Sequence, residues 1–112
     1  LELRTKFINM PYPIDIFFIY HDKKSSWVGG VDGKKKYRYY YPLINQVCGT
    51  DLFGYLMYVP CNPLDIIKSE YGKNWKKPIL SSQYIWNRSP HNMKSAGVYS
   101  IYEMRSARKD YG

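Results

Sequence analysis

The stretch that decides the fold is residues 14–20, which read Ile14-Asp15-Ile16-Phe17-Phe18-Ile19-Tyr20. β-Branched and aromatic residues favour extended chain, and a nearly continuous apolar run is typical of a strand that is covered on both faces. Pro13 precedes the run and a polar segment follows it. The sequence therefore predicts a buried strand over residues 14–20, within a mixed sheet.

A β-hairpin is predicted directly after this strand. The pair Asp32-Gly33 favours a tight turn between residues 27–30 and a second arm over residues 36–41, which Pro42 ends. The second arm, with the two residues before it, is the most basic and aromatic part of the chain: Lys34, Lys35, Lys36, Tyr37, Arg38, Tyr39, Tyr40 and Tyr41. Such a surface can track a nucleic-acid backbone and stack on bases. A solvated hairpin face has the same composition, and no RNA-binding or helix-turn-helix motif accompanies it.

Residues 51–59 are another strand candidate, although Gly54 weakens the middle of the run. Cys48 and Cys61 flank this segment, and their spacing matches no zinc pattern. A continuous strand, at about 3.3 Å per residue, would hold the two cysteines too far apart for a bridge. We therefore expect no disulfide unless the chain turns back at Gly54. With that turn, a bridge would add about 3 kcal/mol of stability; two buried free thiols are the alternative.

The clearest helix is predicted over residues 63–71. Asn62 is a favourable N-cap, Pro63 suits the first helical position, and Gly72 is placed for a left-handed C-cap. An apolar stripe follows helical spacing through Leu64, Ile67 and Tyr71. Residues 73–93 are predicted to be irregular and packed by their tryptophans, and residues 101–109 favour a short helix.

Composition favours one compact unit. The chain has 112 residues, 45% of them hydrophobic and 18% aromatic, which suffices for one core and not two. The net charge of +8 favours anionic partners. No apolar run approaches the roughly 18 residues that a membrane-spanning helix needs. We expect an α+β fold, a mixed sheet with flanking short helices, as a single partial domain over residues 1–112 of a longer protein.

Asp15 is the most informative single residue, because it is the one acid in the apolar run. A buried carboxylate without a partner costs several kcal/mol, so it needs a metal ion, a cation or backbone donors. Two interpretations follow. Asp15 pairs with a basic residue or caps a loop, or it binds Mg²⁺ or Mn²⁺, hard cations that prefer oxygen ligands. The phosphate-binding motifs GxxxxGK[ST] and GxGxxG are absent.

Five sequence blocks resemble, in the same order, the C-terminal part of the fukutin and LicD-type phosphotransferase family. They are residues 14–20, Trp27-Val28-Gly29-Gly30, Val59-Pro60-Cys61, residues 70–78 (Glu-Tyr-Gly-Lys-Asn-Trp-Lys-Lys-Pro) and Trp86-Asn87-Arg88-Ser89-Pro90. The resemblance implies the C-terminal portion of a nucleotidyltransferase-like domain. In this family a phosphorylated alcohol, such as ribitol 5-phosphate, passes from a CDP-activated donor to a glycan or glycoprotein hydroxyl, with help from a divalent cation.

The resemblance also implies roles for single residues. Asp15 matches a strand aspartate of the family's metal site, so it is the expected catalytic residue and ligand of Mg²⁺ or Mn²⁺. Lys73, Trp75 and Arg88 are expected beside the nucleotide and phosphates, although Trp75 also reads as an ordinary contact of the helix end. The family's upstream Asp-x-Asp element has no counterpart here, so we expect this fragment alone to be inactive.

The family implies the Golgi lumen, with the membrane anchor outside this fragment. The competing hypothesis is a non-catalytic basic aromatic module that binds single-stranded nucleic acid or an anionic glycan, with nucleic acid the less favoured ligand. A degenerate family member that assists a partner transferase is a third. The sequence leaves the oligomeric state open.

Overall fold

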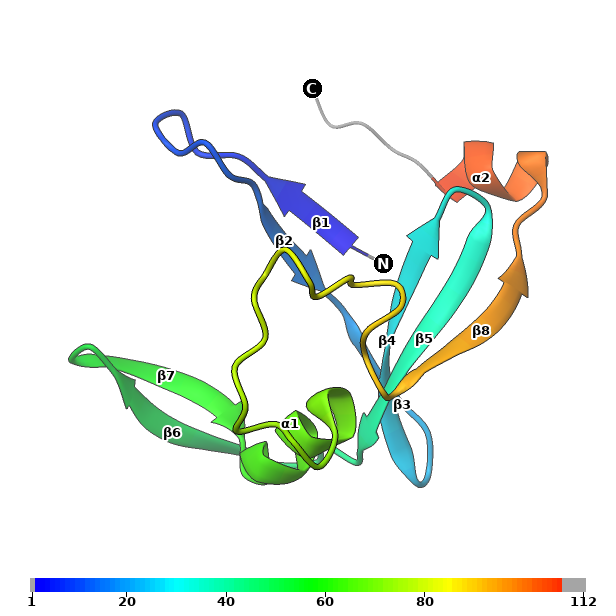
Figure 1. Cartoon of the computed structure of the whole chain (residues 1–112). Helices are drawn as coiled ribbons and strands as arrows, with labels where there is room; N and C mark the ends of the chain where they lie inside the picture. The colour runs from blue at the N-terminus through cyan, green and yellow to red at the C-terminus, as the bar shows by residue number, and fades with distance from the viewer. Residues whose placement is uncertain (1, 108–112) are drawn as a thin grey trace.

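The computed structural model describes residues 2–107 (Figure 1). Within this range the chain forms eight strands and two helices: β1 (Glu2–Thr5), β2 (Ile14–Phe17), β3 (Ile19–His21), β4 (Ser25–Asp32), β5 (Lys35–Pro42), β6 (Val47–Leu52), β7 (Tyr55–Pro60), α1 (Pro63–Tyr71), β8 (Met93–Val98) and α2 (Ile101–Ala107). The strands make three antiparallel sheets, in the orders β1-β2, β3-β4-β5-β8 and β6-β7. The expected α+β class is confirmed.

The centre of the molecule is the four-stranded sheet. β4 and β5 pair from Ser25↔Pro42 to Asp32↔Lys35, and the turn between them uses Gly33 at φ 59°. The predicted hairpin is therefore confirmed. β8, which the sequence did not indicate, returns from the irregular segment to pair with the other edge of β5.

Residues 14–20 do not form one buried strand, so that prediction was wrong. The run divides at Phe18 into β2, which pairs with β1, and β3, which pairs with β4. Its residues are exposed, Ile16 to 51% and Phe17 to 45%. A strand that is apolar on both sides usually has other elements packed against both of its faces. The described part of the chain does not provide such elements for residues 14–20.

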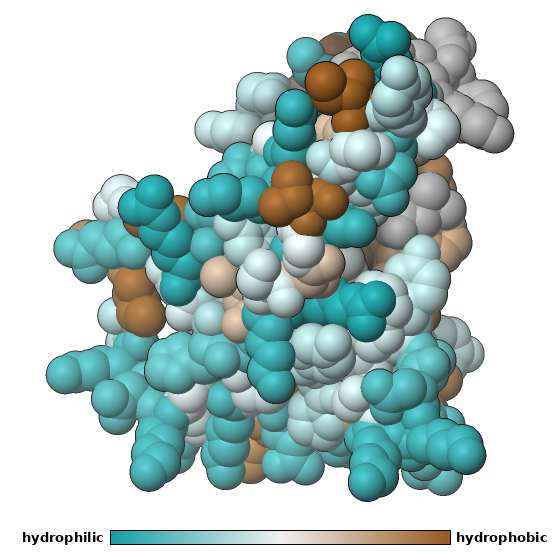
Figure 2. Space-filling view, turned by 90° about the vertical axis from the view of Figure 1, so that its right-hand side faces the viewer, coloured by the Kyte–Doolittle hydropathy of each residue, from teal (hydrophilic) through white to brown (hydrophobic). Residues whose placement is uncertain are grey.

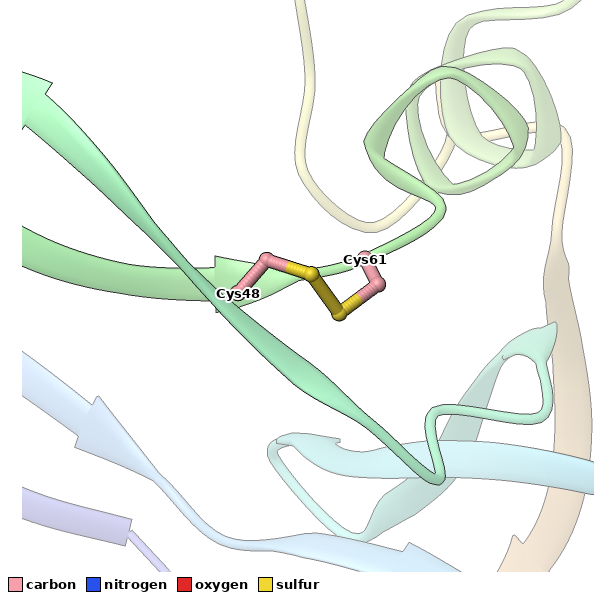
Figure 3. The surroundings of a disulfide bond; sticks show 2 residues. All are labelled: Cys48 and Cys61. Carbon is pink, nitrogen blue, oxygen red and sulfur yellow. A yellow bond between two sulfur atoms is a disulfide. The ribbon is translucent and has the colours of Figure 1, made fainter.

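The β6-β7 hairpin turns back at Phe53 and Gly54, both at positive φ, 51° and 85°. The continuous strand predicted over residues 51–59 was therefore wrong. A turn at Gly54 was the condition for a bridge, and Cys48 and Cys61 do form a disulfide, with their Cα atoms 5.0 Å apart (Figure 3). The bridge ties the two strands together at the end opposite the turn.

Helix α1 begins and ends where the sequence predicted, with Pro63 in its first turn. Two details differ. The Asn62 side chain makes no capping hydrogen bond, and the stripe of Leu64, Ile67 and Tyr71 is exposed rather than packed against a core. The helix instead contacts β5 and β7. The expected second helix is confirmed as far as Ala107; residues 108 and 109 lie outside the described residues.

Burial within residues 2–107 is slight. No hydrophobic side chain there is fully buried, and the fully covered residue is Ser26. The Ser26 hydroxyl accepts the Ile44 N–H at 2.8 Å and forms a second hydrogen bond of 2.8 Å with His21 Nδ1, so it fastens the chain beyond β5 to β3 and β4. No helix in the described range is both long and apolar enough to cross a membrane.

Candidate functional site: a cavity on one face of the central sheet

A cavity of about 610 Å³ opens beside the central sheet. The β1-β2 pair, the end of α1 and the irregular segment after α1 complete its walls, and Figure 1 shows these elements around the same side of β4. The lining residues are Glu2, Arg4, Asp15, Phe17, Val28, Gly29, Gly30, Val31, Tyr39, Tyr41, Glu70, Tyr84, Trp86 and Pro90. The volume is in the usual range for a pocket that binds a small molecule or cofactor.

Gly30 shapes the floor of the cavity. It lies within β4, where a Cβ atom would stand 2.9 Å from Tyr39 Cε2 and 3.6 Å from the Trp86 ring. The Tyr39 hydroxyl also donates a 3.0 Å hydrogen bond to the Trp86 carbonyl. Only a residue without a side chain lets both rings lie this close to the strand. Gly29 and Gly30 both lie within strand β4, and Gly30 brings it close to both rings.

Glu70, in the last turn of α1, is an acid of the cavity that two tyrosines hold in place. Its two carboxylate oxygens accept hydrogen bonds from the Tyr41 hydroxyl at 3.0 Å and from the Tyr84 hydroxyl at 3.1 Å. Burial, with the negative charge of Glu70 as the next cause, raises the pKa of Tyr41 to about 12 and also raises the pKa of Tyr84. Both tyrosines therefore keep their protons at neutral pH and hold the carboxylate in place.

Asp15 faces Arg4 across the β1-β2 pair. Arg4 Nε donates to Asp15 Oδ1 at 2.6 Å and Arg4 Nη2 donates to Oδ2 at 3.0 Å. The hydrogen bonds from Arg4 lower the pKa of Asp15, so the carboxylate stays ionised. The expectation that Asp15 is buried was wrong, because the residue is exposed. Of the two interpretations of Asp15 from the sequence, the structure shows the one in which it pairs with a basic residue.

The described residues do not by themselves provide a complete metal site. Within residues 2–107 no group of three or more histidine, cysteine, aspartate or glutamate residues is placed to hold a metal ion. Asp15 has the right chemistry for a hard cation, but both of its oxygens already accept hydrogen bonds from Arg4.

The remaining residues named from the sequence lie elsewhere. Lys73 and Trp75 follow α1, with Trp75 half-buried and the Lys76 ammonium 5.5 Å from its ring centroid. Arg88 is exposed in the irregular segment. None of the three lines the cavity that contains Asp15. Their assignment to a nucleotide or phosphate stays a prediction.

Sequence reasoning missed Tyr41, Glu70 and Tyr84 as one cluster. Glu70 did carry a signal, because a negative charge in the last turn of a helix opposes the helix dipole and so suggests another reason for its presence. The tyrosines carried none. Tyr41 and Tyr84 are far apart in the sequence, and only the folded chain brings both to Glu70.

Among the known proteins to which the chain is similar, those with a functional name are ribitol-5-phosphate transferases. The chain is 37% identical over 103 residues to a protein of Caenorhabditis elegans named only as uncharacterised, 37% identical over 92 residues to ribitol-5-phosphate transferase FKTN of Macaca fascicularis, and 36% identical over 92 residues to the human protein of that name. These alignments cover 88%, 80% and 80% of this chain. The chain is thus related in sequence to a segment of fukutin-type transferases.

The alignments cover only a part of each relative. The chain spans 27% of the length of the C. elegans protein and 19% of the two transferases. No protein-family model matches the chain, and no solved structure matches it.

Proposed function

We propose that this chain is part of a fukutin-like transferase, which moves ribitol 5-phosphate or a related phosphorylated polyol from a CDP-activated donor to a glycan hydroxyl. The observation that carries the proposal is the 36–37% identity to ribitol-5-phosphate transferases over 80% of the chain. The expected LicD relationship and nucleotidyltransferase-like domain belong to the same proposal.

We assign the donor to the cavity beside β4. Trp86, Tyr39 and Tyr84 offer aromatic surface for a ribose or base. The hydroxyls of Tyr39, Tyr41 and Tyr84 already donate within the protein, and their oxygens can still accept a hydrogen bond from a ligand. The lining carries three carboxylates, of Glu2, Asp15 and Glu70, against the single guanidinium of Arg4. This balance is unfavourable for a bare diphosphate, so a donor of that kind needs added positive charge.

Mg²⁺ or Mn²⁺ is the cofactor proposed to supply this charge, and Asp15 is the carboxylate proposed to bind it. Further ligands must come from outside the described residues, since residues 2–107 contain no complete set. Arg4 holds Asp15 ionised, which is the form that a cation requires.

The disulfide supports an oxidising compartment for this transferase. Bridges such as Cys48–Cys61 persist in the secretory pathway and are rare in the cytosol. The Golgi lumen, with a membrane anchor outside this segment, is the proposed location. The exposed apolar residues of β2, β3 and the β6-β7 hairpin support the related proposal that other parts of the protein cover them.

The test is a transfer assay on the full-length protein that contains this chain. We expect mass spectrometry to detect addition of ribitol phosphate to an acceptor glycan when CDP-ribitol and Mn²⁺ or Mg²⁺ are present, and to detect none after chelation. No product from CDP-ribitol, under conditions in which a known ribitol-phosphate transferase is active, would contradict the proposal.

A further inference from the structure

The central sheet has a second face, turned away from the cavity. Side chains alternate along a strand, so Tyr39 and Tyr41 of β5 point to the cavity while Lys36, Arg38 and Tyr40 point to the opposite side. Register places residues of the neighbouring strands beside them: Trp27 pairs with Tyr40, Lys94 with Arg38, and Tyr20 with Trp27. We call this set, Tyr20, Trp27, Lys36, Arg38, Tyr40 and Lys94, the cation face.

Each of the three cations lies over an aromatic ring. The Arg38 guanidinium is 4.0 Å from the Trp27 ring centroid, the Lys94 ammonium 5.4 Å from that of Tyr40, and the Lys36 ammonium 4.4 Å from that of Tyr99. Tyr20 stacks on Trp27 with 4.5 Å between centroids. An aromatic ring attracts and orients a cation but does not cancel its charge. The face therefore holds three cations in place and leaves them positive.

Within the described part of the chain, no carboxylate forms a salt bridge with these cations. Among residues 2–107, the salt bridges join Arg4 to Glu2 and to Asp15, on the other side of the sheet. Glu103 is near enough to Lys36 for the lysine to help lower its pKa, but the hydrogen bonds from Ser100 are the larger causes. Arg38 and Lys94 are exposed. Figure 2, viewed from the side where β8 and α2 lie, shows a surface of hydrophilic and intermediate residues with isolated hydrophobic ones.

We propose that the cation face binds a sugar chain that carries phosphate groups. Arginine and lysine donors bind phosphate oxygens with charge-assisted hydrogen bonds, and the adjacent rings offer the amphipathic surface on which sugar rings pack. The same chemistry suits single-stranded nucleic acid. The disulfide favours the sugar chain, because it indicates a compartment of the secretory pathway, where free nucleic acid is not a resident partner.

The face and the cavity are separate sites on opposite sides of one sheet. The identification of the bound chain as the acceptor or product of transfer rests on the proposed function, whereas binding itself does not. Variants of the cation face should change acceptor binding and leave donor binding unchanged, and cavity variants should do the reverse.

The test measures binding of a fluorescently labelled oligomer of phosphodiester-linked ribitol to the purified full-length protein, in the absence of any donor. We expect the double variant Arg38→Gln with Lys94→Gln to weaken binding about tenfold or more, because two charged contacts are lost while a polar side chain remains at each position. We expect affinity for the oligomer to fall steeply as salt rises. Lys68→Gln with Lys77→Gln, which removes the same charge outside the cation face, is the matched control.

Three results would overturn the proposal. The double variant could bind the oligomer as tightly as the wild type, the control pair could lose as much affinity as the double variant, or single-stranded DNA of equal charge could bind at least as tightly as the oligomer. Melting temperature and donor binding of each variant show that the sheet remains folded. Since no transfer takes place in this assay, its outcome is independent of whether the cavity accepts CDP-ribitol.

Discussion

At Gly72 the chain leaves α1 with φ 75° and ψ −165°, a conformation that is essentially restricted to glycine. The imidazole of His91 occupies the space beside it, and an added Cβ would stand 2.6 Å from His91 Cε1. His91 is itself tied to the helix end, because its N–H donates to the Glu70 carbonyl at 2.8 Å. The backbone at Gly72 thus helps to position the turn of helix that carries Glu70.

Gly72→Ala should therefore destabilise the protein by about 1 to 3 kcal/mol, since it combines backbone strain with the contact to His91. Urea unfolding measures the difference. Adding His91→Ala should recover only the part due to the contact, because the backbone strain remains. Asn62→Ala at the other end of α1 should be close to neutral, since that side chain makes no capping hydrogen bond. A larger loss from Asn62→Ala than from Gly72→Ala would contradict this description of the helix ends.

Asp15→Asn should abolish metal-dependent transfer in the full-length protein with little change in melting temperature. The carboxylate is needed to bind a cation, whereas its exposed pair with Arg4 contributes little to folding. Arg4→Gln removes the same pair and keeps the carboxylate, and it is the control for melting temperature alone, because Arg4 also lines the cavity. Near-normal turnover of Asp15→Asn at limiting Mn²⁺ would show that Asp15 is not a metal ligand.

Stability should decline between about pH 10 and pH 12 in part because of Tyr41. Its pKa is raised to about 12 in the folded protein, from 10 when exposed, so over this range the folded state retains a proton that the unfolded state releases. The tyrosine's contribution is complete below pH 10 and is lost as the pH rises towards 12. Urea midpoints at a series of pH values should fall more steeply for the wild type than for Tyr41→Phe; equal slopes would exclude this role.

The chemistry of single residues could be predicted from the sequence only in part. The special backbone at Gly72 follows from a helix that ends at a glycine, and Asp15 was recognisable as an acid within an apolar run. Its partner was not predictable, because Arg4 lies on a short strand with no apolar pattern of its own. The Glu70 cluster likewise depends on contacts between distant segments.

At the scale of elements, the β6-β7 hairpin has little support from the rest of the fold. Phe53 at its turn is 92% exposed and Tyr55 is 73% exposed. Its contacts to other elements are mainly the few between β7 and α1. A two-stranded hairpin is marginally stable alone, so the disulfide is the feature that keeps this one formed.

We expect non-reducing peptide mapping of the native protein to recover Cys48 and Cys61 as one linked pair. Cys48→Ser with Cys61→Ser should destabilise the hairpin by up to about 3 kcal/mol. Hydrogen exchange should then accelerate in β6 and β7 while β4 and β5 remain protected, since those strands do not depend on the bridge. Two free thiols in the native protein would contradict the hairpin.

The sequence predicted elements best where local signals agree. Pro63 and Gly72 bound α1, and Asp32-Gly33 locates the turn between β4 and β5. Prediction from the sequence failed where an apolar run was compatible with two geometries. Gly54 allowed either a weak strand or a turn, and Phe18 gave no sign that it separates strands of two different sheets.

At the scale of the whole molecule, the central sheet separates two chemically different sites. One side carries an aromatic cavity with three carboxylates, and the other carries three cations over aromatic rings. A transferase of this proposed kind must bind an activated donor and a separate acceptor, and the two faces offer a place for each. The net charge of +8 indicated an anionic partner but not which face it would use.

The central claim is that the cavity beside β4 binds the donor. Steady-state donor KM in the full-length protein tests it most directly. Trp86→Ala is the cavity variant, and Trp75→Ala, outside the cavity lining, tests the competing assignment of the donor to the loop after α1. We predict that Trp86→Ala raises the KM for CDP-ribitol about tenfold, through loss of a stacking surface, and that Trp75→Ala leaves it unchanged. An unchanged donor KM for Trp86→Ala, with a raised one for Trp75→Ala, would contradict the assignment and place the donor at the loop after α1.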